Sequence, residues 1–272
     1  MTTRSRACIR LWTACLLAAA LPASAGCSRP LDVPMAPIGL SVSFDGEKPA
    51  GLYPALLREI AVSSGCEFQL RRVPRARLQK MFESGQADLL IPASASPSRD
   101  ADGEFVPLIQ VRTSLITLLR ERPQPRSLAE LIAQPDYKVA IVRGFSFGAA
   151  YDNAMATLRA QKRLIEEADA SGVARALRLG IAQGTVMSAS IFVSTLVSEP
   201  ELAPLLKQAR VDPLEELGWS ESGLYLSRHT LNEPDRRALR QAFSQAVRSG
   251  RVWQLLNDSY PPGSLAGSIR QL

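Results

Sequence analysis

The sequence predicts an α/β fold, for two reasons. Short apolar runs of strand length, such as Ala87–Ile91 and Lys138–Val142, alternate with segments whose apolar residues recur at helical spacing. Glycine and proline separate these segments, and the chain contains no internal repeat or low-complexity tract. We therefore expect sheets with helices packed against them.

The first half of the chain contains residues that mark where helices and strands begin and end. Asp45-Gly46 predicts a turn after the first strand. Leu56, Leu57 and Ile60 fall on one face of a helix that Gly65 ends. The elements expected here are strands at 29–33, 67–73, 87–91 and 114–119, and helices at 51–61 and from Pro74 onward.

The second half continues the alternation. Ser127 and Glu130 form a capping box, which predicts a helix start. Asn232 precedes a long amphipathic helix that Gly250 ends. The further elements expected are strands at 138–142, 164–168, 185–190 and 223–227, and helical regions at 172–180, 201–208 and 252–260.

The N-terminal residues are typical of a secretory leader. Arg4, Arg6 and Arg10 flank the start of an apolar segment, residues 11–21, and Ala23-Ser24-Ala25 is a small-x-small cleavage pattern. The apolar segment is too short to span a bilayer as a helix. We expect residues 1–25 to be a signal peptide and the protein to be periplasmic.

Two cysteines, Cys27 and Cys66, remain after the leader is removed. Export to an oxidising compartment favours a disulfide between them. Gly26-Cys27 also resembles a lipoprotein signal, in which case Cys27 would be acylated and Cys66 would be a lone thiol. Both interpretations stay open at this point.

Charge and metal-ligand content exclude several classes of function. The net charge of +6 includes the three leader arginines, so residues 26–272 carry +3, and the basic residues are scattered. That pattern argues against a nucleic-acid partner. The chain has one histidine and no C-x-x-C, so we expect no metal site and no cofactor.

The strand at 87–91 opens into small hydroxyl residues followed by an arginine. In parallel sheets, ligands lie beyond the carboxyl ends of strands, where Ser94, Ser96 and Arg99 are found. Arginine presents a planar fork of donors that fits a carboxylate. The stretch therefore predicts a site for an anionic ligand.

Gly85, Asp88 and Ser96-Pro97-Ser98-Arg99 match a known pattern, a helix ending in "sG", then "D", an apolar strand and "T-p-e-R". In this the chain resembles the amino-acid-type (family 3) periplasmic solute-binding proteins of ABC transporters, and the resemblance covers nearly everything after residue 30. It implies a two-lobed, type II periplasmic binding protein fold, each lobe a mostly parallel sheet flanked by helices, with two crossovers at the hinge. The implied lobes are 26–119 with 223–272, and 120–222.

The resemblance also implies ligand contacts. Relatives show "v-P-w-x-R" where this chain has Pro74 to Arg77, so Arg77 is retained and Arg75 replaces an aromatic residue. Arg75 is expected to be a solvated first-turn residue. The family loop "v-G-v-x-x-G-t" matches the loop that contains Gly144 and Ser146, where backbone N–H groups would meet a negative group.

The expected ligand is a small carboxylate-bearing solute, an amino acid or a related compound. Relatives place an acid for the ammonium group near residues 184–190, and this chain has none there. The solute would be trapped by hinge closure in a monomer that acts without chemistry. An ABC permease or a membrane sensor would recognise the closed form.

A hydrolase is the competing hypothesis. Gly144-Phe145-Ser146-Phe147-Gly148 is a G-x-S-x-G sequence between a strand and a helix, the context of a nucleophile elbow. Asp152 or Asp169, and then His229, follow Ser146 in an order that permits a triad. No HGGG-type oxyanion loop precedes the motif.

Overall fold

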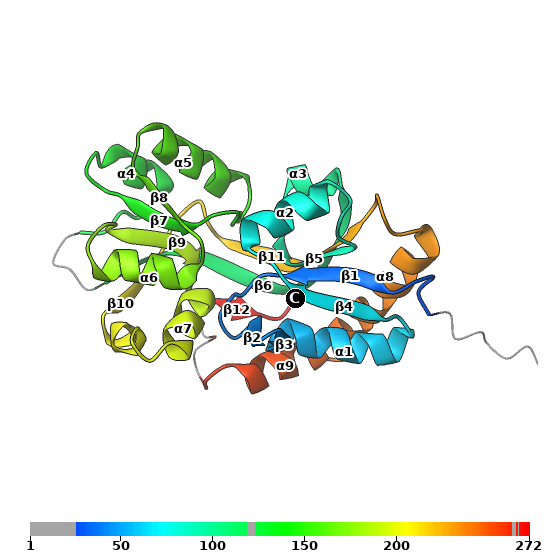
Figure 1. Cartoon of the computed structure of the whole chain (residues 1–272). Helices are drawn as coiled ribbons and strands as arrows, with labels where there is room; N and C mark the ends of the chain where they lie inside the picture. Colours follow the sequence, from blue (N-terminus) through cyan, green and yellow to red (C-terminus); the bar gives the residue numbers. More distant parts are fainter. Residues whose placement is uncertain (1–25, 119–122, 263–264, 266) are drawn as a thin grey trace, which may run out of the picture.

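The computed structural model describes residues 26–118, 123–262, 265 and 267–272. Figure 1 shows an elongated molecule of two lobes, with one long strand, β6 (Gly103–Leu118), running from the first lobe into the second. The two-lobed α/β fold class predicted from the sequence is confirmed. The predicted signal peptide and the predicted boundary between residues 119 and 120 lie outside the described residues.

The first lobe is built on parallel strands β1 and β4, with β5 beside β1. Strand β11 lies antiparallel between β5 and the first part of β6. The remaining strands and helices of this lobe surround that sheet (Figure 1). Their bounds are β1 (Leu31–Met35), β2 (Ser43–Asp45), β3 (Lys48–Ala50), α1 (Leu52–Ser64), β4 (Phe68–Arg72), α2 (Arg75–Glu83), β5 (Leu89–Ser94), α3 (Pro97–Asp100), β11 (Trp219–Ser227), α8 (Glu233–Arg248), α9 (Arg251–Ser259) and β12 (Ile269–Arg270).

The second lobe has its own sheet, in which β7 pairs in parallel with β8 and β9. The last part of β6 pairs antiparallel with β9 and with β10. The predicted start of α4 is confirmed, because the Ser127 side chain accepts the N–H of Glu130 at 3.0 Å. The Glu130 carboxylate accepts the N–H of Arg126 at 2.9 Å and not that of Ser127, so the reciprocal half of the predicted capping box is not formed. The bounds are α4 (Leu128–Ala133), β7 (Val139–Val142), α5 (Ala149–Ala160), β8 (Leu164–Glu167), α6 (Ala170–Arg178), β9 (Gly184–Ser188), α7 (Ala189–Ser198), the 3-10 helix η1 (Ala203–Lys207) and β10 (Ala209–Pro213).

The lobes meet where β6 changes partners. Arg112 pairs with Trp219 of β11, whereas the next residue, Thr113, pairs with Ser188 of β9. Each lobe has buried apolar clusters of its own, so each can keep its shape while the other moves. None of the helices in the described ranges is both long and apolar enough to traverse a membrane.

A disulfide joins Cys27 and Cys66, whose Cα atoms lie 4.6 Å apart. It links the residues just before β1 to those just before β4, two strands that pair in parallel. A sulfur in a disulfide cannot carry a thioether-linked lipid, so the structure favours the disulfide over acylation of Cys27.

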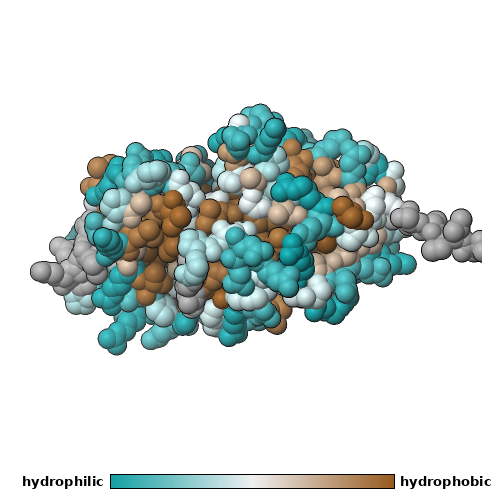
Figure 2. All heavy atoms as spheres, turned by 90° about the horizontal axis from the view of Figure 1, so that it is seen from below, coloured by the Kyte–Doolittle hydropathy of each residue, from teal (hydrophilic) through white to brown (hydrophobic). Residues whose placement is uncertain are grey.

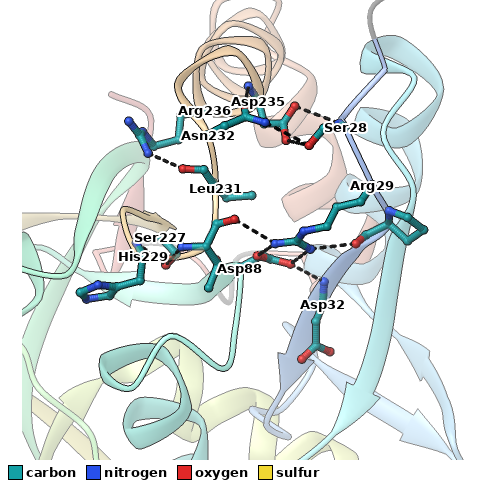
Figure 3. Close-up of polar contacts among 12 residues, drawn as sticks. Ser28, Arg29, Asp32, Asp88, Ser227, His229, Leu231, Asn232, Asp235 and Arg236 are labelled. Atoms are coloured by element: carbon teal, nitrogen blue, oxygen red, sulfur yellow. Dashed lines mark hydrogen bonds and ion pairs between the residues drawn. The ribbon is translucent and has the colours of Figure 1, made fainter.

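The chain that follows the disulfide is held by a polar network, which we call the N-terminal clasp (Figure 3). Arg29 donates two hydrogen bonds to the carboxylate of Asp88, at 2.7 and 2.8 Å. The same carboxylate accepts the backbone N–H of Asp32 at 2.7 Å. Ser28 binds the carboxylate of Asp235 on α8 through its N–H and its hydroxyl. The clasp fixes the start of β1 against β5 and α8.

We expect Asp88→Asn to lower the free energy of unfolding by about 1–3 kcal/mol at pH 7. Burial raises the pKa of the Asp88 carboxyl, but the hydrogen bonds from Arg29 and the N–H of Asp32 outweigh burial and hold that pKa below its usual range. A group with a depressed folded-state pKa stabilises the fold above its unfolded pKa of about 4 and loses that contribution as pH falls through the folded value.

Urea unfolding of both proteins from pH 7 to pH 2 checks this expectation. The stability difference between wild type and Asp88→Asn should be constant down to about pH 4 and should shrink below it. A difference that does not change with pH would mean that the charge of Asp88 contributes nothing.

Candidate ligand-binding site

Two small adjoining cavities lie between the lobes, each about 50 Å³ in volume. Both are lined by Ile38, Pro92 and Ser94 of the first lobe, by Ser222 of β11, and by Phe147 and Ile191 of the second lobe. Ligand sites in proteins are usually larger, about 300–1,000 Å³. The lobes are therefore close together in this structure, and a solute would have to part them.

Arg75 lines the first of the two cavities and carries a buried charge that pairs with no carboxylate of the described residues. It is the first residue of α2 and is 8% exposed. One terminal nitrogen donates to the carbonyl of Pro92 at 3.1 Å, and the buried Nε has no hydrogen-bond partner. Its guanidinium carbon lies 5.7 Å from the ring centre of Phe145, an aromatic residue of the second lobe. Burial, and then the nearby Arg99, lower the pKa of Arg75 to about 9.

The second cavity combines apolar residues with a group of hydroxyl residues. The second cavity is lined by Tyr53 and Ser41 of the first lobe and by Ser188 and Ser190 at the start of α7. Burial raises the pKa of the Tyr53 phenol well above its usual range, so the group stays protonated and can donate a hydrogen bond. Ser188 and Ser190 hydrogen-bond to each other at 2.7 Å.

Of the ligand contacts predicted from the sequence, the structure brings Ser94 and Ser146 into the cavity lining. Arg99 is not among the lining residues. It is 2% exposed and donates to the carbonyl of Ser94 at 2.9 Å and to the side chain of Gln79 at 3.0 Å. Arg99 thus supports the cavity wall from behind, and its contact with a ligand stays a prediction.

The other predicted contacts lie outside the lining. Ser96 is buried, and its hydroxyl faces that of Ser98 at 2.9 Å. Arg77 is exposed to solvent. Gly144 packs so closely on α2 that an added Cβ would lie 3.3 Å from the Cα of Ala76. This contact joins the lobes directly beside Arg75.

Arg75 is the site residue that sequence reasoning missed. It was expected to be a solvated first-turn residue, and the structure buries it between the lobes instead. One feature of the sequence pointed to an unusual role for an arginine at this position: a cation in the first turn of a helix opposes the helix dipole. No acid in the first turn of α2 compensates for it.

The structure does not assemble the hydrolase triad. The Ser146 hydroxyl donates to Asp152 at 2.8 Å, with no imidazole between them. His229 bonds instead to Asp102 of the first lobe, at 2.9 Å, and Asp169 caps α6. A triad needs the histidine between the serine and the acid, so these contacts do not activate Ser146.

Two further surface features could hold a ligand by their shape or their apolar character (Figure 2). A groove of about 660 Å³ runs between α1 and α8, but its charged residues, Glu59 and Arg251, already pair at 2.6 Å. Figure 2 shows apolar side chains gathered on the face of the second lobe where α7 and β10 lie. The exposed apolar residues on these elements include Val197 and Val211. Neither feature presents an unpaired charge to a ligand.

No protein-family model matches the chain, and a search of curated proteins found no relative. Solved structures do share its fold. A histidine kinase sensor domain with similarity to periplasmic binding proteins superposes with a TM-score of 0.69 at 17% identity, covering 89% of this chain and 98% of that one. EhuB in complex with hydroxyectoine gives 0.67 at 15% identity, with 88% and 92% covered.

An amino acid ABC transporter substrate-binding protein, AbpA from Streptococcus pneumoniae bound to L-arginine, gives a TM-score of 0.64 at 17% identity, with 85% of this chain and 94% of that one covered. The chain therefore has the type II periplasmic binding protein fold expected from its sequence. These structural neighbours are binding proteins and a sensor domain.

Proposed function

We propose that the protein is a periplasmic solute-binding protein that captures a small carboxylate-bearing solute between its lobes. The observation that carries the proposal is Arg75, a buried cation that lines the interlobe cavity and has no carboxylate partner in the part of the chain that the structure describes. A buried guanidinium left unpaired is costly, and an anion that supplies hydrogen bonds relieves that cost.

Both lobes would contribute to the site. The first, 26–119 with 223–272, supplies Arg75 and Ser94, and the second, 120–222, supplies Ser146 and Phe147. Because the cavities are small in the closed arrangement, the solute enters an open form and closure buries it. Closure bends the chain near Arg112 and Thr113, where β6 changes partners.

The closed monomer would deliver its solute to an ABC permease, as expected from the amino acid transport protein among its structural neighbours. The histidine kinase sensor domain, which has the highest TM-score of the neighbours compared above, favours a second candidate function, in which a membrane sensor reads the same closed form. Capture of the solute is common to both candidates.

A thermal-shift screen of the exported protein against small carboxylates tests the proposal. A carboxylate present at 100 times its dissociation constant should raise the melting temperature by about 5–10 °C. Arg75→Gln should abolish the shift, while Arg77→Gln, an exposed arginine on the same helix, should leave it unchanged. The proposal fails if carboxylates produce no shift, or if both variants respond alike.

A further inference from the structure

The two interlobe cavities share an unusual set of polar groups. One cation, Arg75, and one phenol, Tyr53, line them, together with six serine hydroxyls. The serines are Ser41, Ser94, Ser146, Ser188, Ser190 and Ser222. No aspartate or glutamate is among the residues that line either cavity.

This lining is suited to a carboxylate and unsuited to an ammonium group. A buried ammonium needs an acid to offset its desolvation, and here it would also lie near the guanidinium of Arg75. The carboxylate of Asp152 accepts the hydroxyl of Ser146 at 2.8 Å, but Asp152 itself does not line either cavity. A ligand hydroxyl, by contrast, can donate to one serine or tyrosine oxygen and accept from another.

The polar groups are also arranged from one end of the site to the other. Arg75 lines only the first cavity and Tyr53 only the second, while Ser94 and Ser222 lie where the two adjoin. Ser222 is among the groups that influence the pKa of the Tyr53 phenol, and both residues line the second cavity, so the phenol lies near this junction. A solute with a carboxylate at one end and hydroxyls at the other would match the order of these groups.

We infer that the solute is a small hydroxycarboxylate without an ammonium group, whose carboxylate is held by Arg75 and whose hydroxyl is met by Tyr53 and the neighbouring serines. This inference rests on the proposed function, since it names the class of solute that the proposed site takes.

Calorimetric titration with matched acids tests the inference. The panel pairs lactate with alanine, glycerate with serine and malate with aspartate, so that each pair differs only in a hydroxyl or an ammonium group. Propionate and succinate, which carry neither group, complete the panel. At least one hydroxy acid should bind about 100-fold or more tightly than its amino counterpart, because the site leaves the ammonium unpaired.

Tyr53→Phe separates the hydroxyl contact from the carboxylate contact. The variant keeps the buried ring and removes only the phenol oxygen. It should weaken the hydroxy acid about tenfold, the size of one hydrogen bond, and should leave the affinity for the matching deoxy acid unchanged. The deoxy acid is thus the control for any disturbance of the fold.

The outcomes separate this inference from the proposed function. Amino acids that bind as tightly as their hydroxy counterparts would overturn the inference and leave the proposed function standing. A deoxy acid that binds as tightly as the hydroxy acid would overturn the assigned role of Tyr53 and the serines. If none of the eight acids binds, the proposed function fails, and the inference fails with it.

Discussion

Arg75→Met is expected to raise the free energy of unfolding of the ligand-free protein by about 1–3 kcal/mol and, at the same time, to abolish carboxylate binding. In the empty protein the guanidinium is buried, and its Nε has no hydrogen-bond partner among the described residues. Its compensation is one hydrogen bond to the carbonyl of Pro92 and the face of Phe145. Methionine fills much of the same space without a charge. The loss of the donor to the carbonyl of Pro92 offsets part of the gain.

Chemical unfolding of the wild type and Arg75→Met at pH 7, together with titration of a binding carboxylate, measures both effects. Arg77→Met is the matched control, since Arg77 is an exposed arginine two residues further along α2. It should change stability by no more than about 0.5 kcal/mol and should keep binding. A destabilised Arg75→Met that still binds would show that the charge serves the fold and not a ligand.

Turns and helix starts could be predicted from the sequence because they are formed by residues that are close together in the chain. The Asp45-Gly46 turn joins β2 to β3, and Ser127 caps α4 as its sequence predicts. The last residues of β5, Pro92 to Ser94, line the interlobe cavities, close to where the small hydroxyl residues suggested a site. These features depend on neighbours in sequence, which a single chain displays directly.

The identity of the buried cation could not be predicted in the same way. Arg75 and Arg77 both lie in the first turn of α2, and only the rotation of about 100° per residue along a helix separates the face packed between the lobes from the face in solvent. Which face meets the second lobe depends on the approach of Gly144 and Phe145, about 70 residues away in sequence. The spacing of residues in the sequence alone does not predict that contact.

Arg99 shows a similar limit. Its position after the small hydroxyl residues predicted a ligand contact, but α3 is a helix of only four residues, Pro97–Asp100. This short turn brings the guanidinium back onto the carbonyl of Ser94. The interlobe cavity thus lies at the expected end of β5, but Arg75 and not Arg99 is the arginine that lines it.

Removal of the disulfide is expected to lower the free energy of unfolding by about 4 kcal/mol, the chain-entropy value for a loop of this length. Cys27 and Cys66 are 39 residues apart, so the bond restricts a sizeable part of the unfolded chain. Urea unfolding of the double variant Cys27→Ala/Cys66→Ala, compared with the oxidised wild type, measures the loss. Ligand affinity should be unchanged because neither cysteine lines the interlobe cavities.

The N-terminal clasp makes that loss depend on a second interaction. Arg29 and Ser28 hold the same segment that Cys27 holds, through Asp88 and Asp235. If the disulfide and the N-terminal clasp both secure the start of β1, Asp88→Asn should lower the free energy of unfolding more in the disulfide-free variant than in the wild type. In that variant the clasp is the remaining attachment. Equal costs in the two backgrounds would mean that the disulfide acts only on the unfolded chain, as the entropic account of crosslinks requires.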